Sequence, residues 1–255
     1  MRNTNSSWQS SGRLYTRKYG QVFLRNPKIA RHEAESLGLP PGSRILEIGP
    51  GRGILTRALL NNGYVVIGVE SDHRWVSELQ SSFQDEIAAG SLSIHRGNFL
   101  EFPPGGFDGI AGNIPYMISS KIIFRLRDFR FKAAVLMVQE EFAKRLTAKY
   151  GTKDYSRLTV NSNLFFDISV VRKVSKGSFY PVPGVDSAVV RIVPKETSIA
   201  IPDNFDTILS KLFSNRRKKI GTVFPGAPEA FRDMRVGDLP PLEILNLASQ
   251  LGPVA

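Results

Sequence analysis

The sequence predicts an α/β fold: a mostly parallel, doubly wound sheet of seven strands with an antiparallel hairpin at one edge, followed by a small C-terminal helical domain. Short apolar stretches alternate with longer segments whose apolar residues recur at helical spacing, a pattern typical of strand–helix–strand units. After residue 167 two strand-like stretches follow each other without a helix, so they are expected to pair antiparallel. The expected strands cover residues 44–49, 65–69, 92–95, 107–112, 133–138, 168–174 and 188–193.

The helices between these strands are indicated by apolar periodicity and by cap residues. Asn26 followed by Pro27 is a typical helix start, with Ile29, Ala30 and Ala34 on the inner face. Further helices are expected over residues 54–60, 72–83, 117–129, 140–146, 158–166, 205–213 and 242–251. The chain is thus expected to contain a polar, basic arm (1–19), a catalytic domain (20–197) and a small helical domain (198–255).

The charge of the chain favours a polyanionic partner. Its 255 residues carry a formal net charge of +11, with a pI near 10.0. Basic residues are concentrated in the first 32 residues and again in residues 121–153, which flank the stretch interpreted below as a site. A basic, solvated surface is the alternative, but nucleic acid is the more common partner of such a protein.

The residue types that are absent exclude several chemistries. There is no cysteine, so disulfides, thiolate metal sites and a thiol nucleophile are excluded. The histidines His32, His73 and His95 lie too far apart in sequence to indicate a metal site, and no metal is expected. No apolar run approaches the length of a membrane span and the N-terminus has no apolar signal region, so we expect a cytoplasmic protein that does not contact membranes.

A glycine-rich turn follows the first strand of the main domain. Gly49, Gly51 and Gly53 allow the backbone to approach a ligand at a helix N-terminus, and Glu47 precedes them. Glu70 ends the next strand, where its carboxylate can accept hydrogen bonds from both ribose hydroxyls of a nucleoside. The dinucleotide fingerprint is G-x-G-x-x-G, whereas this chain has an acidic residue followed by G-x-G-x-G. The spacing therefore favours S-adenosylmethionine, with a tight turn without a ligand as the alternative.

The tetrapeptide Asn113–Tyr116 stands where a strand ends and a helix begins. The exocyclic amine of adenine is a poor nucleophile, and carbonyl oxygens of Asn113 and Ile114 could accept from its N–H groups. Pro115 holds the turn with its fixed φ, and Tyr116 offers a ring on which a base can stack. An ordinary turn is the alternative for such a short motif, and Tyr116 and Phe179 could instead be core aromatics.

Three motifs together resemble the KsgA-type rRNA adenine N6,N6-dimethyltransferases. They are Glu47–Gly53, Asn113–Ser120 and Phe179–Ala188, and they occur in family order and at family spacing. Gln139–Arg145 and Asp154–Leu158 are most similar to the archaeal branch. The resemblance runs from Gly20 to about Pro194 and continues more weakly through residues 212–219. It implies a Rossmann-like, S-adenosylmethionine-dependent methyltransferase fold.

The resemblance assigns roles to individual residues. The residues implied to line the cofactor site are Val22, Leu24, Gly49, Gly51, Glu70, Asn98 and Asn113. Asn113, Pro115 and Tyr116 would hold the target amine, and Phe179 would stack on the flipped base from the opposite side. The family usually has Asn or His at the position of Val22 and Asp at that of Asn98. The neutral amide of Asn98 is therefore expected to weaken cofactor binding somewhat.

The implied reaction is transfer of two methyl groups from S-adenosylmethionine to N6 of each of two adjacent adenosines. The implied substrate is the 3′-terminal hairpin of small-subunit (16S) rRNA within a 30S precursor, and the enzyme is expected to be monomeric. One alternative is a methyltransferase of the macrolide-resistance type acting on large-subunit (23S) rRNA. Others are an assembly or transcription factor on the same scaffold and, last, a dinucleotide oxidoreductase.

Overall fold

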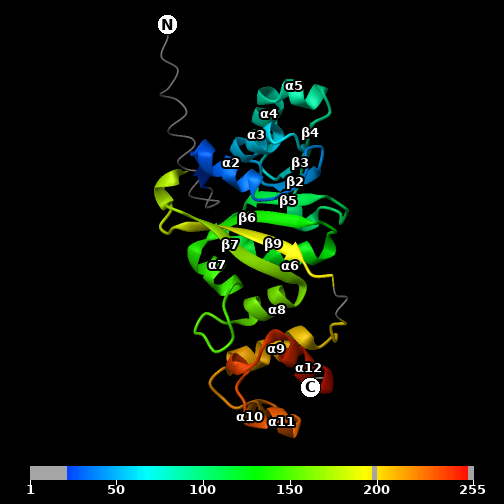
Figure 1. Cartoon of the computed structure of the whole chain (residues 1–255), viewed down its shortest axis with the longest axis vertical. Coiled ribbons are helices and arrows are strands. Elements are labelled where there is room, and N and C mark those ends of the chain that lie inside the picture. The colour runs from blue at the N-terminus through cyan, green and yellow to red at the C-terminus, as the bar shows by residue number, and fades with distance from the viewer. Residues whose placement is uncertain (1–21, 197–199, 252–255) are drawn as a thin grey trace. The chain divides into compact units, whose positions relative to one another are not determined.

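The fold is taken from a computed structural model, which describes residues 22–196 and 200–251 (Figure 1). The basic arm expected over residues 1–19 lies outside the described residues. Among the described residues, no helix is long and apolar enough to cross a membrane.

A seven-stranded sheet forms the centre of the fold, with strand order β4-β3-β2-β5-β6-β9-β7. Its strands are β2 (Arg44–Ile48), β3 (Val65–Glu70), β4 (Leu92–Arg96), β5 (Gly109–Asn113), β6 (Ala133–Gln139), β7 (Phe166–Val174) and β9 (Ser187–Pro194). The strands β4, β3, β2, β5 and β6 run parallel to one another, and β9 runs antiparallel to β6. The predicted sheet is therefore confirmed, including its antiparallel edge.

The strands form where they do because the sheet is covered on both faces. In β6 every residue from Ala133 to Val138 is buried, which is typical of a parallel strand between two layers of helices. The two edge strands, β4 and β7, contain several exposed positions. The continuous apolar runs of the sequence thus mark the central strands.

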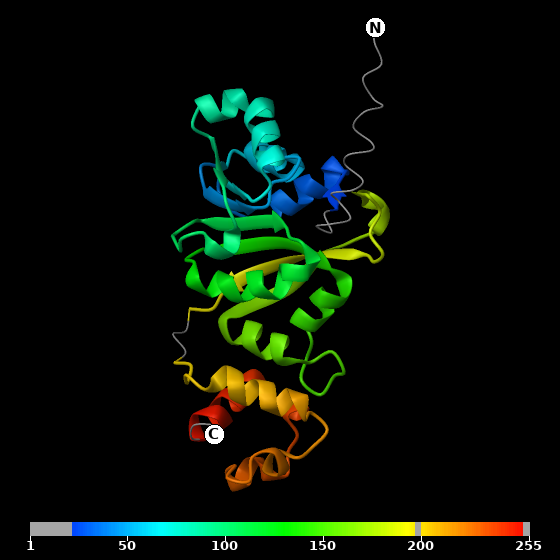
Figure 2. The same ribbon diagram turned by 180° about the vertical axis from the view of Figure 1, so that it is seen from behind.

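Three helices pack on one face of the sheet, and their apolar residues join one buried cluster with β2, β3 and β6. They are α2 (Pro27–Glu35), α3 (Ile54–Asn61) and α4 (His73–Ser82), the last capped by Asp72 as predicted, with α5 (Gln84–Ala88) following. The helix α6 (Ser119–Arg125) buries Ile122 and Ile123 away from this cluster and is seen in front of the sheet in Figure 2.

A second, two-stranded sheet joins two segments of the first part of the fold that lie far apart in the sequence. The strand β1 (Phe23–Leu24) pairs antiparallel with β8 (Phe179–Tyr180), so that Leu24 lies opposite Phe179. The Arg25 N–H donates to the Ser178 carbonyl at 2.8 Å and extends the pairing. The sequence did not predict either strand, because two residues are too few to show a period.

The chain divides into two compact units. The first contains the described chain up to Glu140 together with Val170–Ile192, and the second contains Glu141–Ser169 and the chain from Val193. The sequence assigned residues 141–169 to the catalytic domain, whereas their contacts group them with the C-terminal helices. The boundary at residue 198 stays a prediction about which parts fold independently.

The second unit has its own apolar core. Its helices are α7 (Glu140–Leu146, from Glu141 on), α8 (Arg157–Phe165), α9 (Phe205–Ser214), α10 (Ile220–Val223), α11 (Glu229–Arg232) and α12 (Pro241–Gln250). Tyr155 is buried among apolar side chains of α8, α9 and α12, and its hydroxyl donates to the Leu239 carbonyl at 2.8 Å. Arg216 donates to the carbonyls of Thr152 and Lys153 at 2.5 and 2.8 Å, which ties the loop before α8 to the helical core.

Candidate active site

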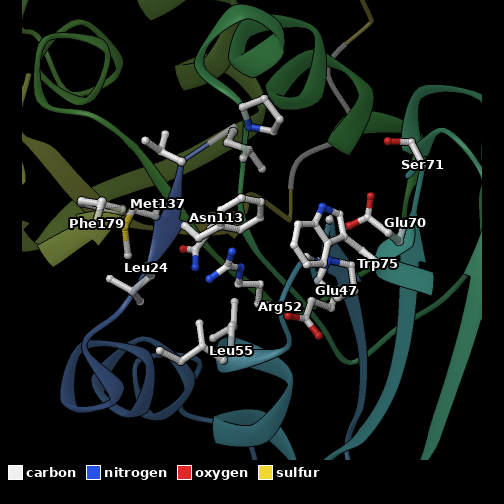
Figure 3. Close-up of a pocket in the computed structure, with 18 of the residues that line it drawn as sticks. Leu24, Glu47, Arg52, Leu55, Glu70, Ser71, Trp75, Asn113, Met137 and Phe179 are labelled. Atoms are coloured by element: carbon white, nitrogen blue, oxygen red, sulfur yellow. The ribbon is translucent and has the colours of Figure 1, made fainter. Parts of the chain in front are cut away.

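An open cavity of about 900 Å³, part of which is open solvent, lies in the first unit at the carboxyl ends of β2, β3 and β5. Ligands of open α/β sheets bind at this end of the strands. In Figure 3, Leu24, Asn113, Met137 and Phe179 lie on one side of the cavity, and Glu47, Glu70, Ser71 and Trp75 lie on the other. The wall therefore brings together the two sheets and the glycine turn.

The glycine turn has a left-handed backbone that only glycine adopts without strain. Gly49 has φ +64° and Gly53 has φ +77°. A Cβ added to Gly49 would meet no heavy atom within 4 Å, whereas one added to Gly53 would lie 2.6 Å from the Phe83 ring. Gly49 therefore keeps the backbone open at the cavity, and Gly53 allows α3 to begin against α4.

The Glu70 carboxylate is held at the end of β3 by two backbone groups. It accepts from the Gly51 N–H at 3.0 Å and from the Asp72 N–H at 2.8 Å. These bonds come from the glycine turn on one side and from the start of α4 on the other. Both carboxylate oxygens keep a further lone pair, so Glu70 can still accept from ligand hydroxyls in the cavity.

Two aromatic rings and a cation form another part of the wall. The rings of Phe23 and Trp75 meet edge to face, with centroids 5.0 Å apart. The Arg52 guanidinium lies over both of them, 5.0 Å from the Phe23 centroid and 5.3 Å from that of Trp75. Because Arg52 belongs to the glycine turn, these contacts connect the turn to β1 and α4.

The Asn113–Tyr116 segment leaves β5 and lines the opposite side of the cavity. The Ile114 N–H donates to the Met137 carbonyl of β6 at 3.3 Å, which continues the parallel ladder one residue past the strand. The Tyr116 hydroxyl and the Ser187 hydroxyl lie 2.9 Å apart, so the ring of Tyr116 is fixed from β9. The segment is thus held from two strands of the sheet.

Behind Asn113 lies Glu33, which the sequence interpretation did not single out. It is fully buried on α2, and both its carboxylate oxygens are 3.1 Å from the Asn113 amide nitrogen when the amide is turned toward it. The helical spacing could have revealed it, since Glu33 follows Ile29 by four residues and Ala30 by three. An acidic residue on the inner face of a helix needs a polar partner.

Burial raises the pKa of three carboxyl groups around the cavity. For Glu33 the rise comes mainly from burial and also from the nearby charge of Glu47. For Glu47 burial raises the pKa to about 8, although the Thr56 hydroxyl donates to it at 2.7 Å. The pKa of Glu70 is also raised by burial, and its backbone hydrogen bonds oppose the rise. A cation in the cavity would favour the ionised forms of these groups.

Asn98 is the one predicted site residue that does not line this cavity. It is exposed after β4, where its side chain accepts from the Leu100 N–H at 3.1 Å and donates to Glu101 at 3.0 Å. It therefore caps the short 3₁₀ turn η1 (Phe99–Glu101). An Asp at this position would face the Glu101 carboxylate, so the neutral amide suits its neighbour. Its role toward a cofactor stays a prediction.

The other residues proposed from the sequence all line the one cavity. They are Val22, Leu24, Gly49, Gly51, Glu70, Asn113, Pro115, Tyr116 and Phe179. Their chemical roles stay predictions, but their convergence is a fact of the fold. Sequence interpretation missed Glu33, Met137 and Trp75, which have no motif of their own.

The residues present fit S-adenosylmethionine. The cavity offers an acidic group at the end of β3, a backbone turn without side chains at Gly49, and aromatic faces from Phe23 and Trp75. Two buried polar atoms at its wall, Glu47 Oε1 and Trp75 Nε1, have no hydrogen-bond partner in the described chain. Among the described residues, no group of three His, Asp or Glu side chains could hold a metal ion.

The sheet order, the glycine turn and the acidic residue ending β3 define a methyltransferase fold of the S-adenosylmethionine-dependent class. Comparison of the sequence with protein families matches residues 13–251 to the family described as Ribosomal RNA adenine dimethylase. The chain belongs to this family, as its three motifs predicted.

Curated relatives agree with this assignment. The chain is 39% identical over 232 residues to a probable ribosomal RNA small subunit methyltransferase A of Methanospirillum hungatei, covering 89% of this chain and 90% of that protein. It is 38% identical over 251 residues to the protein of the same description from Methanosarcina mazei, covering 91% and 92%. The predicted similarity to archaeal members is confirmed.

Solved structures show the same fold. A dimethyladenosine transferase from Plasmodium falciparum superposes with a TM-score of 0.77 at 32% identity, covering 88% of this chain and 95% of that one. The 23S rRNA methyltransferase ErmE superposes with a TM-score of 0.72 at 28% identity, covering 90% and 99%. The fold is therefore shared with a dimethyladenosine transferase and with a 23S rRNA methyltransferase.

Proposed function

We propose that this protein transfers methyl groups from S-adenosylmethionine to N6 of two adjacent adenosines in the 3′-terminal hairpin of small-subunit rRNA. The observation that carries the proposal is the convergence of the glycine turn, Glu70 and the Asn113–Tyr116 segment on one cavity. The curated relatives are named small-subunit methyltransferases, which supports the small subunit as the source of the RNA.

In this proposal the glycine turn and Glu70 hold the nucleoside part of the cofactor. Glu70 would accept from its ribose hydroxyls, and Gly49 and Gly51 would let it lie against the backbone. Val22 and Leu24 would contact the cofactor from the β1 side. Asn98 would contribute only if the η1 turn rearranged, because its side chain is engaged by Leu100 and Glu101.

Asn113, Pro115, Tyr116 and Phe179 would hold the target adenine. S-adenosylmethionine supplies an already activated methyl group, so the chain has to align and desolvate the amine. The Asn113 side-chain oxygen would accept one amine N–H and draw the nitrogen lone pair out of conjugation. Tyr116, fixed by Ser187, and Phe179 provide aromatic surfaces for a base turned out of its helix.

The partner in this proposal is small-subunit rRNA within a 30S precursor, bound by a monomer in the cytoplasm during ribosome biogenesis. A hairpin loop suits extrusion of a base, because its bases are already partly unstacked. The net charge of +11 supports an RNA partner.

The large-subunit alternative shares this fold, since ErmE superposes well on the chain. The two proposals differ in the particle that accepts the methyl group. Tritiated methyl transfer to isolated undermethylated 30S and 50S particles, followed by mapping of the labelled base, separates them. Label on adjacent adenosines of the 30S hairpin is expected, and label confined to 50S particles would refute the small-subunit proposal.

The assembly-factor alternative predicts a different result. A protein that acts only by binding would complement a null strain when Asn113 is replaced, although it would transfer no label. The proposed enzyme would lose both the label and the modified bases in that strain.

A further inference from the structure

Glu33 is an acidic side chain that is buried inside an apolar core. Burial of such a group costs free energy, so a polar partner or a functional role is expected for it. Glu33 has no exposed surface and does not line the cavity, whereas its neighbour Asn113 does. Glu33 can therefore act on a bound substrate through Asn113, the cavity residue that lies within hydrogen-bond distance of it.

The Asn113 amide can take two orientations that differ in which atom faces Glu33. With the oxygen toward Glu33, an acceptor faces the two oxygens of an ionised carboxylate, and no hydrogen bond forms. With the nitrogen toward Glu33, the amide lies 3.1 Å from both oxygens and donates to them. An ionised Glu33 therefore selects the second orientation, which turns the amide oxygen toward the cavity.

We propose that Glu33 is a positioning residue for methyl transfer: its carboxylate orients the Asn113 amide so that the oxygen accepts from the target amine. The inference rests on the proposed function, in which Asn113 contacts that amine. A carboxylate behind the amide also increases the negative charge on its oxygen, which strengthens the acceptor.

The orientation depends on the proton of Glu33. A protonated carboxyl can donate its O–H to the Asn113 oxygen, which would turn the NH₂ group toward the cavity. Two donors would then face each other at the target amine. The pKa of Glu33 is raised well above its ordinary value, chiefly by burial. The loss of the productive orientation is therefore expected at a higher pH than for an ordinary glutamate.

Few other charged groups surround Glu33. Glu47 of β2 is the group whose charge raises its pKa. The packed strand β6 contains no charged residue, and the charged residue of α3, Arg57, pairs with Glu86. Arg191 of β9 donates to the Ser36 carbonyl just past the end of α2. A pH effect that survives removal of Glu33 would therefore point to Glu47.

Two substitutions of Glu33 separate orientation from charge. Glu33→Gln keeps an oxygen that can accept from the Asn113 nitrogen but does not titrate. Glu33→Leu keeps the approximate volume and removes the acceptor. Glu35→Gln is the matched control, because Glu35 is exposed on the same helix. Each variant is measured for its affinity for S-adenosylmethionine, for its turnover on undermethylated small subunits from pH 5.5 to 9, and for thermal unfolding.

We expect Glu33→Leu to lower kcat about 10- to 100-fold, because one hydrogen bond at the reacting group is misdirected. Its affinity for S-adenosylmethionine should stay within about threefold of the wild-type value. Glu33→Gln should recover most of that loss and remove the fall in kcat that protonation of Glu33 causes as the pH is lowered. Glu35→Gln should keep the wild-type pH profile. A folded Glu33→Leu protein with wild-type kcat, or a Glu33→Gln protein whose kcat falls with pH as in the wild type, would overturn the proposal.

A second readout does not depend on turnover. The side-chain amide resonances of Asn113 should shift with pH in the wild-type protein and stay constant in Glu33→Gln. Resonances that do not respond to pH in the wild type, or respond equally in both proteins, would overturn the proposal. If the wild type methylated no small subunit while this difference persisted, the proposed function would fail and the orientation by Glu33 would stand.

Discussion

At the scale of single residues, the cavity depends on polar groups that are held from behind. Asn113 is backed by Glu33, Tyr116 by Ser187, and Glu70 by the N–H groups of Gly51 and Asp72. Such contacts fix a side chain before a substrate arrives, so less ordering remains to be done on binding. In the proposed function, one residue of each pair would contact the ligand and its partner would hold that residue in place.

Replacing Asn113 by alanine should lower turnover about 10²- to 10³-fold, as removal of one preorganised polar group at a reacting centre does. The fold should remain, because Asn113 is only partly buried at the end of β5. Methyl transfer to small subunits and a thermal melt measure the two effects. Asn246→Ala, an exposed position on α12, is the control. Near-normal turnover of Asn113→Ala would contradict the proposed role.

Glu47 gives the stability of the protein a pH dependence. Its pKa is raised from 4.5 to about 8 in the fold, so between these values the folded chain holds a proton that the unfolded chain has lost. The free energy of unfolding therefore falls as pH rises, by up to about 1.4 kcal/mol per pH unit for one group.

Replacing Glu47 by glutamine should remove this contribution. As the pH is raised from 5 to 8, the wild type should lose on the order of 2–4 kcal/mol of unfolding free energy that Glu47→Gln does not lose. Urea unfolding of both proteins at the two pH values measures the difference. Parallel pH dependences of the two proteins would show that the carboxyl group of Glu47 titrates normally.

At the scale of secondary-structure elements, the glycine turn is where strand, helix and cavity meet. Gly53 precedes α3 with φ +77°, and its missing Cβ leaves room for the Phe83 ring, which follows α4. The turn therefore serves two purposes at once, since Gly49 opens the cavity while Gly53 lets two helices approach. Both depend on φ values that other residues adopt only under strain.

Gly53→Ala should destabilise the protein by about 2–4 kcal/mol, because it adds a steric clash to the backbone strain. Gly90→Ala is a matched control: Gly90 has φ +73°, but its Cβ would meet nothing within 4 Å. It should cost only about 1 kcal/mol. Chemical unfolding of both variants measures the difference. Equal losses would mean that the Phe83 ring moves aside without cost.

At the scale of the whole molecule, the excess positive charge has more than one use. In the second unit Arg216 donates to two loop carbonyls, whereas Arg217 and Lys218 beside it are exposed. The neighbouring Lys219 forms an ion pair with Asp233 at 2.6 Å. A basic run in the sequence thus contains both structural cations and cations that solvent can reach.

The double substitution Arg217→Glu and Lys218→Glu should weaken RNA binding and flatten its salt dependence if both residues contact phosphates. The slope of log K against log salt is negative, and each lost contact should reduce its magnitude by about 0.7–0.9. Filter binding from 50 to 300 mM salt measures the slope. Arg216→Ala should instead lower the unfolding temperature. An unchanged slope in the double variant would place the RNA elsewhere.

The sequence by itself determined the alternation of strands and helices, the position of the glycine turn and the family. These features are local, because the pattern that predicts a strand or a turn lies within a few consecutive residues. Asp72 and Gly53, for example, begin helices that follow them directly in the sequence. Seven strands and eight of the eleven α-helices of the described residues could be predicted for this reason, whereas the short helices α5, α10 and α11 were not. The residues of the cavity wall that belong to motifs could be predicted as well.

Only the tertiary structure decided which distant residues meet. The pairing of Leu24 with Phe179 joins strands of two residues, too short to carry a period. Asn98 faces Glu101 rather than the cavity, and Glu33 lies behind Asn113 although it belongs to no motif. Burial gives these groups their partners and their shifted pKa values, and burial is a property of the packed chain. Burial of these groups could therefore not be predicted from a short run of consecutive residues.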